Sequence, residues 1–254
     1  MTEQPGESQL HSRASIARTR RPVHWRQTPT HVELELVPDD DLDLPSRGRL
    51  SWLHDGLKRV IDLVGALMLL VALLPLFVVV AVAIKVDSHG PIFFPHRRLG
   101  RDGRHFDCLK FRTMQLDAER RVFENEELRH QYVSNHFKIP SHLDPRITKL
   151  GAFLRRSSID ELPQLWNVLV GEMSLVGPRP IVALEATHYG DELPTLLSVR
   201  PGVTGLWAVQ GRSKLGYPQR AEIELSYVRT RTLALDIRIL ASTPWTVLTQ
   251  RGTI

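Results

Sequence analysis

Two adjacent carboxylates, Asp160 and Glu161, are the strongest candidates for chemistry in this sequence. Ser158 precedes them, and a Gly-Pro-Arg-Pro run opens at Gly177, sixteen residues after Glu161. An acidic pair accompanied by arginines suits the handling of an anion together with a metal ion. A structural interpretation also fits, because Ser158 followed three residues later by Glu161 forms a capping box, and acids in a first helical turn offset the helix dipole.

Three cations could accompany these carboxylates by binding phosphate oxygens. Lys110 and Arg112 are two residues apart on a predicted strand, so their side chains point to the same face. Arg179 lies between two prolines, whose fixed φ angles hold its backbone rigidly. A guanidinium fork can bind two phosphate oxygens at once. Each of the three would, taken alone, also fit an ordinary surface charge.

An amphipathic helix is predicted over residues 160–170. Its apolar positions follow the spacing i, i+3, i+4, i+7: Leu162, Leu165, Trp166 and Leu169. Pro163 is tolerated only near a helix start, so the first turn lies around Ser158 to Asp160, and Gly171 is a suitable stop. We expect Trp166 in the core. We also expect exposed backbone N–H groups beside Asp160, where an anionic ligand can bind.

The segments around this helix are shorter. Residues 91–94 and 106–111 read as two strands, with a turn over residues 97–103 whose glycines suit positive φ. Residues 115–137 form a predicted polar helix with a solvated face. Residues 200–207 are rich in turn formers and end at Trp207, which suits either the core or a membrane interface. Residues 227–248 form an apolar helix that lies in the core or in the headgroup plane.

An apolar segment precedes the catalytic candidates. Residues 63–84 contain no charge over 22 positions, which is long enough to span a bilayer. Pro75 interrupts the run near its middle and bends a helix there. Basic residues mark the cytoplasmic side, and here they flank both ends of the run. A helix that enters, bends at Pro75 and returns keeps both ends inside; a kinked spanning helix is the alternative.

Composition sets wider bounds. The 254 residues suffice for one medium domain with appendages, and residues 1–50, which are polar, are expected to be a disordered tail with no signal peptide. The single cysteine, Cys108, fits a reducing compartment, and the eleven histidines show no zinc-site spacing. A net charge of +5 favours nucleic acid, phosphate or anionic lipid without choosing among them.

Several long motifs occur together in the order found in one enzyme family. They are Arg98-Leu99-Gly100, Lys110-Phe111-Arg112-Thr113-Met114, Asp144-Pro145-Arg146-Ile147-Thr148, residues 160–167 (DELPQLWN), residues 173–180 (MSLVGPRP) and residues 200–207 (RPGVTGLW). On these motifs, residues 55–254 resemble bacterial sugar transferases, the polyprenyl-phosphate hexose-1-phosphate transferases with a monotopic membrane fold. The resemblance is greatest to members that initiate exopolysaccharide synthesis with galactose or glucose 1-phosphate. Two positions depart from the usual pattern: Leu74 precedes Pro75 where serine is common, and Ala208 follows the tryptophan where glutamine is common.

The resemblance implies an α+β, mostly helical fold with a re-entrant helix kinked at Pro75 over residues 51–88. Residues 89–254 would then form a cytosolic catalytic domain with amphipathic interfacial helices, at the cytoplasmic face of the bacterial inner membrane. The implied reaction transfers hexose 1-phosphate from a UDP-hexose to undecaprenyl phosphate and releases UMP. Asp160 would be the nucleophile, with Glu161 as a catalytic residue and the ligand for Mg²⁺.

The same resemblance implies five phosphate-binding residues: Arg98, Lys110, Arg112, Arg179 and Arg200. The partners expected are the UDP-hexose, the polyprenyl phosphate and membrane lipid, with no nucleic acid. Association of several copies of the chain into a homo-oligomer is left open, as is the identity of the sugar.

Two other functions compete with this hypothesis. A non-catalytic, membrane-tethered anion-binding protein accounts for the charge and the apolar run but gives no reason for the adjacent acids. A glycosyltransferase that moves the sugar without its phosphate usually carries a DxD motif after a strand. The run Asp39-Asp40-Asp41 fits that spelling but lies in the predicted tail with no strand pattern before it.

Overall fold

A computed structural model of the chain describes residues 49–116, 144–211 and 216–249, together with Glu124, Glu126 and His130. All of them belong to one compact unit, residues 37–254. The expectations for the tail, for the acidic run at 39–41 and for most of the polar helix at 115–137 fall outside the described residues.

The α-helices are α1 Arg49–Asp87, α4 Lys149–Ser157, α5 Gln164–Val170, α6 Leu193–Leu197, α7 Leu206–Gln210, α8 Gln219–Thr230 and α9 Leu233–Leu248. The strands are β1 Phe93–Leu99, β2 His105–Phe111, β3 Ser174–Val176 and β4 Gly202–Thr204, and the short 3-10 helices are η1 Arg101–Gly103, η2 Ile159–Glu161, η3 Ala183–His188 and η4 Gly190–Glu192.

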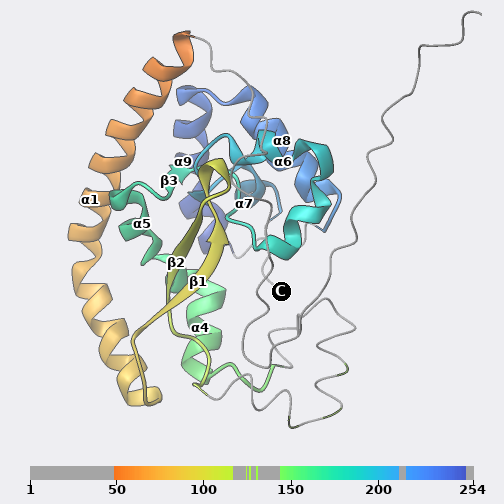
Figure 1. Ribbon diagram of the computed structural model, residues 1–254. Helices are drawn as coiled ribbons and strands as arrows, with labels where there is room; N and C mark the ends of the chain where they lie inside the picture. Colours follow the sequence, from red (N-terminus) through yellow and green to blue (C-terminus); the bar gives the residue numbers. More distant parts are fainter. Residues whose placement is uncertain are drawn as a thin grey trace, which may run out of the picture. The chain divides into compact units, whose positions relative to one another are not determined.

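The predicted apolar segment is a single long helix, α1, which continues through Pro75. Figure 1 shows it as a continuous, curved ribbon beside α5 and β3. Within the described residues it is the one helix long and apolar enough to cross a membrane, over His54–Asp87. The structure therefore confirms a long apolar helix compatible with a membrane anchor. The re-entrant bend at Pro75 stays a prediction.

Both ends of α1 are attached to the same body of the protein. Near its start, Arg59 donates from both terminal nitrogens to the carbonyl oxygens of Val168 and Leu169, over 2.6 and 2.9 Å. Near its end, the guanidinium of Arg112 donates to the carbonyl oxygens of Ser88 and His89, over 2.6 and 2.7 Å. The helix therefore lies along the domain instead of leading away from it.

One face of α1 packs against the domain and the opposite face is apolar and exposed. The packed face contributes buried residues to two hydrophobic clusters, Ala66 to one and Val80 and Ile84 to the other. The exposed face carries large apolar side chains along its whole length: Leu57, Val60, Leu63, Val64, Leu67, Met68, Leu69, Val71, Leu74, Val78, Val79, Val82 and Val86. An exposed apolar surface of this extent marks a site of contact with lipid or protein.

The two predicted strands form an antiparallel hairpin, with Phe93 opposite Phe111 and Leu99 opposite His105. A turn was expected over residues 97–103, but β1 continues to Leu99 and the turn is limited to η1. Side chains alternate along a strand, so the adjacent residues Arg97 and Arg98 point to opposite faces. Arg97 points to solvent near Asp107, whereas Arg98 is buried and donates to the carbonyl oxygen of Pro180. The arginine pair therefore suits a strand, and the expectation of a longer turn was wrong.

Close backbone contact joins the two glycine-containing motifs. Strands β3 and β4 are parallel, and a Cβ added to Gly202 would lie 2.0 Å from the backbone nitrogen of Gly177. Only glycine permits this approach. The turn-rich segment at 200–207 thus supports the loop that carries Arg179.

The predicted apolar helix at 227–248 is two helices, α8 and α9, with the chain extended at Arg231 and Thr232. The Thr232 side chain accepts from the backbone N–H of Leu235, so it caps α9 and begins a new helix. The described part of the chain is mostly helical with two small sheets, which confirms the α+β class. The interfacial placement of its amphipathic helices stays a prediction.

Candidate active site

Asp160 lies in the short 3-10 helix η2, which connects α4 to α5, and not in the first turn of α5 itself. Helix α4 ends at Ser157, Ser158 adopts a left-handed conformation with φ 57°, and η2 follows before α5 begins at Gln164. Ser158 makes no side-chain capping bond to η2, so the expected capping box does not form. The N–H of Glu161 donates to the Ser158 carbonyl oxygen, so this N–H is not available to an anionic ligand.

The turn also changes which side of α5 is buried. Leu165 and Val168 face the core, but Trp166 is 56% exposed, so the prediction that it lies in the core was wrong. Asn167 points inward because it binds β2: its amide oxygen accepts from the N–H of Leu109, and its amide nitrogen donates to the carbonyl oxygen of Asp107. The buried face of α5 therefore includes Asn167 in place of Trp166.

Burial and charge both act on the Asp160 carboxyl. The side chain is buried, and burial together with the negative charge of Glu161 raises its pKa from 3.8 to about 6. Lys110 and Arg155 act in the opposite direction, because their positive charges favour the carboxylate. A carboxyl of this kind is ionised at neutral pH and poorly hydrated, which suits a nucleophile.

Glu161 and Lys110 form the ion pair beside this carboxyl. The Lys110 ammonium lies 2.7 Å from Glu161 Oε1, and both side chains keep about a fifth of their surface exposed. The strand β2 and the η2 turn are thereby joined, as the contacts between these elements also show. Lys110 therefore lies where it can meet an incoming phosphate next to the two acids.

A pocket opens next to the ion pair. It is lined by Arg98, Cys108, Lys110, Glu161, Gln164, Arg179, Pro180, Gly202, Val203 and Trp207. Four of the seven residues proposed from the sequence, Arg98, Lys110, Glu161 and Arg179, meet there. Arg98 and Arg179 line the same pocket, and burial together with the positive charge of Arg179 lowers the pKa of Arg98. Two adjacent arginines on one wall suit a ligand that carries several negative charges.

The guanidinium of Arg179 lies over an aromatic ring and near several glutamates. Its guanidinium carbon lies 5.2 Å from the ring centre of Trp207, which is buried rather than interfacial. Burial alone would lower the pKa of Arg179, but nearby glutamates outweigh it and raise the pKa. One of them, Glu224, is completely buried and accepts a short hydrogen bond from the hydroxyl of Tyr189.

Comparison of the sequence with known protein families identifies the family. The sequence profile of the bacterial sugar transferases matches residues 53–250. The chain belongs to this family. Bacterial sugar transferase relatives include the "UDP-galactose-lipid carrier transferase" of Erwinia amylovora, 43% identical over 77% of this chain and 41% of the relative. The "Undecaprenyl-phosphate galactose phosphotransferase" of Salmonella typhimurium is 41% identical over 77% of this chain and 41% of the relative.

A shorter relative matches over most of its own length. The "Exopolysaccharide production protein ExoY" of Sinorhizobium fredii is 40% identical over 77% of this chain and 87% of that protein. The first two relatives are longer, and this chain spans about two fifths of their length. The family match over residues 53–250 covers most of α1, the hairpin and the Asp160 turn.

Some motifs of this bacterial sugar transferase support the site rather than lining it. In the Asp-Pro-Arg-Ile-Thr motif, Arg146 donates two hydrogen bonds of 2.8 Å to the Asp144 carboxylate. Thr148 then caps α4, and its N–H donates to the carbonyl oxygen of Thr113. The motif fixes α4 against the end of β2, and α4 leads directly into the Asp160 turn.

Arg112 and Arg200 are placed away from the pocket beside Glu161. Arg112 is buried and its guanidinium binds carbonyl oxygens at the end of α1. Arg200 donates from Nε to the carbonyl oxygen of Gly171 and lines a different pocket. The structure therefore does not bring these two arginines together with the other predicted phosphate-binding residues.

Three residues that the sequence did not single out belong to the site. Arg155 acts on Asp160 and donates from Nε to the Thr113 hydroxyl, over 2.8 Å. Gln164 lines the pocket, and Glu224 supports Arg179. Gln164 belonged to a motif already noted, which was a usable signal. Arg155 and Glu224 have the spacing of ordinary helix charges, so their sequence context gave none.

The carboxylate pair could hold a metal ion only together with ligands from a substrate. No group of three or more His, Cys, Asp or Glu side chains that could hold one occurs among the described residues. Mg²⁺ is commonly bound by only one or two carboxylates together with substrate phosphates. Asp160 and Glu161 fit that arrangement, since their like charges lie close enough for Glu161 to raise the pKa of Asp160.

Proposed function

We propose that this protein transfers hexose 1-phosphate, galactose or glucose, from a UDP-sugar to undecaprenyl phosphate and releases UMP. The names of the relatives point to a sugar donor and to undecaprenyl phosphate as acceptor. The observation that carries the proposal is the placement of a buried carboxylate, Asp160, beside an ion pair and a pocket lined by arginines. This combination suits attack on a phosphorus atom whose oxygens must be neutralised.

The reaction would proceed in two displacements. In the first, an oxygen of Asp160 attacks the phosphorus attached to the sugar, the bond from that phosphorus to the bridging oxygen breaks, and UMP leaves. In the second, an oxygen of undecaprenyl phosphate attacks the same phosphorus, and the Asp160 carboxylate departs. The product is undecaprenyl diphosphate hexose. Asp160 needs no base for its attack, because it is already ionised at neutral pH.

The cations around the carboxyl have separable tasks in this mechanism. Lys110 and Arg155 keep Asp160 ionised and offset charge near the phosphorus. Arg98 and Arg179 bind phosphate oxygens along the pocket wall, and the stacking of Arg179 on Trp207 fixes its direction. Glu161, with Asp160, would hold Mg²⁺. When bound, the ion would neutralise charge on the diphosphate.

The membrane arrangement supports a lipid acceptor. Both ends of α1 are tied to the catalytic body, and its exposed face is apolar. A monotopic placement at the cytoplasmic face of the inner membrane would let a UDP-sugar from the cytosol and a lipid phosphate reach one site. The exposed Trp166 on α5, a helix that packs against α1, fits contact with the same membrane surface.

The purified protein, incubated with undecaprenyl phosphate and a panel of UDP-sugars, tests this function. We expect UMP release with UDP-galactose or UDP-glucose and formation of a lipid-linked sugar diphosphate, both absent in Asp160→Asn. Release of UDP instead of UMP would indicate a glycosyltransferase that leaves the phosphate behind. Absence of turnover with every sugar would favour the non-catalytic anion-binding alternative.

A further inference from the structure

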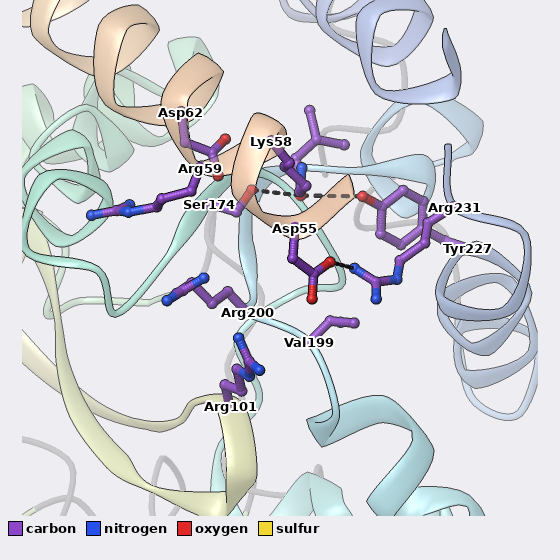
Figure 2. Close-up of a pocket in the computed structure, with 11 residues that line it drawn as sticks. Asp55, Lys58, Arg59, Asp62, Arg101, Ser174, Val199, Arg200, Tyr227 and Arg231 are labelled. Carbon is purple, nitrogen blue, oxygen red and sulfur yellow. Dashed lines mark hydrogen bonds and ion pairs between the residues drawn. The ribbon is translucent and has the colours of Figure 1, made fainter. Parts of the chain in front are cut away.

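A second basic pocket lies beside the first turns of α1. It is lined by Asp55, Lys58, Arg59, Asp62, Arg101, Ser174, Val176, Val199, Arg200, Tyr227 and Arg231 (Figure 2). It shares no lining residue with the pocket beside Glu161. Its five cations outnumber its two carboxylates, so the lining carries a net positive charge.

Three of the five cations are committed to partners within the protein. Lys58 lies 2.6 Å from the Asp236 carboxylate, and Arg231 lies 2.7 Å from Asp55. Arg59 uses both terminal nitrogens on carbonyl oxygens of α5. These contacts fix the walls of the pocket and neutralise part of its charge.

The other two cations, Arg101 and Arg200, keep donors available. Arg200 uses Nε on the Gly171 carbonyl oxygen, and within the described residues its terminal nitrogens make no hydrogen bond. Arg101 forms an ion pair with Asp102, with 3.5 Å between Nε and the carboxylate, but this buried nitrogen donates no hydrogen bond among the described residues. Figure 2 shows both guanidinium groups on the same side of the pocket, across from the Asp55–Arg231 pair.

Bringing these arginines together has an electrostatic cost unless an anion joins them. Arg59 and Arg200 both bind carbonyl oxygens at the end of α5, so two positive charges lie close to each other even before Arg101 is counted. Their backbones are held in place, Arg101 by η1 and Arg200 by the adjacent Pro201 and β4. A preformed group of donors that repel one another is the usual arrangement of a phosphate-binding site.

We infer that this pocket binds a phosphate group through Arg101 and Arg200. Two arginines with available donors on one side of the pocket match a single phosphate group. Leu57 and Val60 are exposed on the turn of α1 beside the pocket, where the exposed apolar face of this helix begins. A phosphate bound next to that face can therefore belong to the headgroup of an anionic membrane lipid. A free phosphate ion has the same chemistry.

Binding is tested with the full chain purified in a neutral detergent. The probes are inorganic phosphate, short-chain phosphatidylglycerol and short-chain phosphatidylcholine, and the readouts are the melting temperature and the dissociation constant. The variants are Arg101→Gln, Arg200→Gln and, as the matched control, Arg97→Gln. Arg97 lies on the same hairpin, is 67% exposed and lines neither pocket.

We expect phosphatidylglycerol to raise the melting temperature of the wild type. Arg101→Gln and Arg200→Gln should each weaken this binding about tenfold or more, the size of one lost charge-assisted hydrogen bond. Arg97→Gln should bind as the wild type does. Among the described residues the Arg101 side chain makes no hydrogen bond, so its variant remains informative if Arg200→Gln fails to fold.

The probes distinguish the sources of the phosphate. Binding of phosphatidylglycerol with little binding of inorganic phosphate supports a lipid headgroup, and tight binding of both supports a general phosphate site. Equal binding of phosphatidylcholine and phosphatidylglycerol that Arg101→Gln leaves unchanged would indicate contact through the acyl chains and would overturn the inference. So would an equal loss in the Arg97→Gln control.

Discussion

Asp160 gives the protein a pH dependence that can be measured. Its pKa is raised to about 6 by burial and by the charge of Glu161, and only the ionised carboxylate can attack phosphorus. The fraction of active enzyme should therefore fall below about pH 6, roughly tenfold for each further pH unit. A rate profile with a UDP-hexose and undecaprenyl phosphate measures this acidic limb. A flat profile down to pH 4.5 would contradict the assignment of Asp160 as nucleophile.

Replacing Glu161 by Gln should move the acidic limb. The change removes the like charge that helps to raise the pKa of Asp160, but burial, the larger cause, remains. We expect the midpoint in the residual activity to lie between 3.8 and 6. The same profile with Lys110→Gln is the matched comparison. Loss of this positive charge should move the midpoint to higher pH, and a shift of both variants in one direction would be inconsistent with the electrostatics described.

Glu161→Gln also tests the magnesium proposal. An amide is a weaker ligand than a carboxylate for a hard cation, so the variant should need a higher Mg²⁺ concentration for half-maximal activity. Titration of Mg²⁺ into metal-depleted enzyme measures this directly. If the wild type and the variant have the same Mg²⁺ dependence, Glu161 does not hold the metal, and its pairing with Lys110 is its main role.

At the scale of elements, Arg112 tests the attachment of α1. Its buried guanidinium donates to carbonyl oxygens of Ile84, Ser88 and His89, so Arg112→Gln removes charge-assisted hydrogen bonds that fix the end of α1. We expect a loss of about 1–3 kcal/mol in the free energy of unfolding, seen as a lower melting temperature. Lys110→Gln, at a partly exposed pair, should melt closer to the wild type while losing turnover. An Arg112→Gln variant with wild-type melting and weakened UDP-sugar binding would instead support phosphate binding by Arg112.

The elements differ in how well they can be predicted from sequence. The length of α1 and the two hairpin strands follow from composition and alternation, and Gly171 ends α5 in a left-handed conformation as expected. The break before Asp160 did not follow, because a left-handed Ser158 is an unusual conformation for a residue other than glycine. An unbroken apolar pattern therefore predicted one helix where the chain makes a separate turn.

For the candidate site, the sequence indicates residues with distinctive motifs and misses residues that only tertiary contacts bring there. Asp160, Glu161 and Arg179 carry charges in stiff, distinctive motifs. Arg112 belongs to such a motif too, but its acceptors lie more than twenty residues earlier in the chain. Glu224 lies in α8, whose many charges give no sign that one of them is fully buried.

At the scale of the whole molecule, the attachment of α1 at both ends predicts that they lie on one side of the membrane. Single cysteines introduced as Gly56→Cys and Asp87→Cys, in a Cys108→Ser background, mark the two ends at exposed positions. A membrane-impermeant thiol reagent should label neither in intact cells and both after lysis. Labelling of one position but not the other in intact cells would mean that α1 spans the bilayer.

The central claim is that Asp160 becomes covalently bound to the sugar phosphate, and the mass of the intact protein tests it most directly. The protein is incubated with the UDP-hexose that supports turnover, without lipid acceptor, and then quenched and weighed. We predict an added mass of one hexose phosphate, mapped to Asp160, with one equivalent of UMP released. The adduct should disappear when undecaprenyl phosphate is added and be absent in Asp160→Asn. UMP released only in the presence of lipid, with no adduct at any time, would contradict the account.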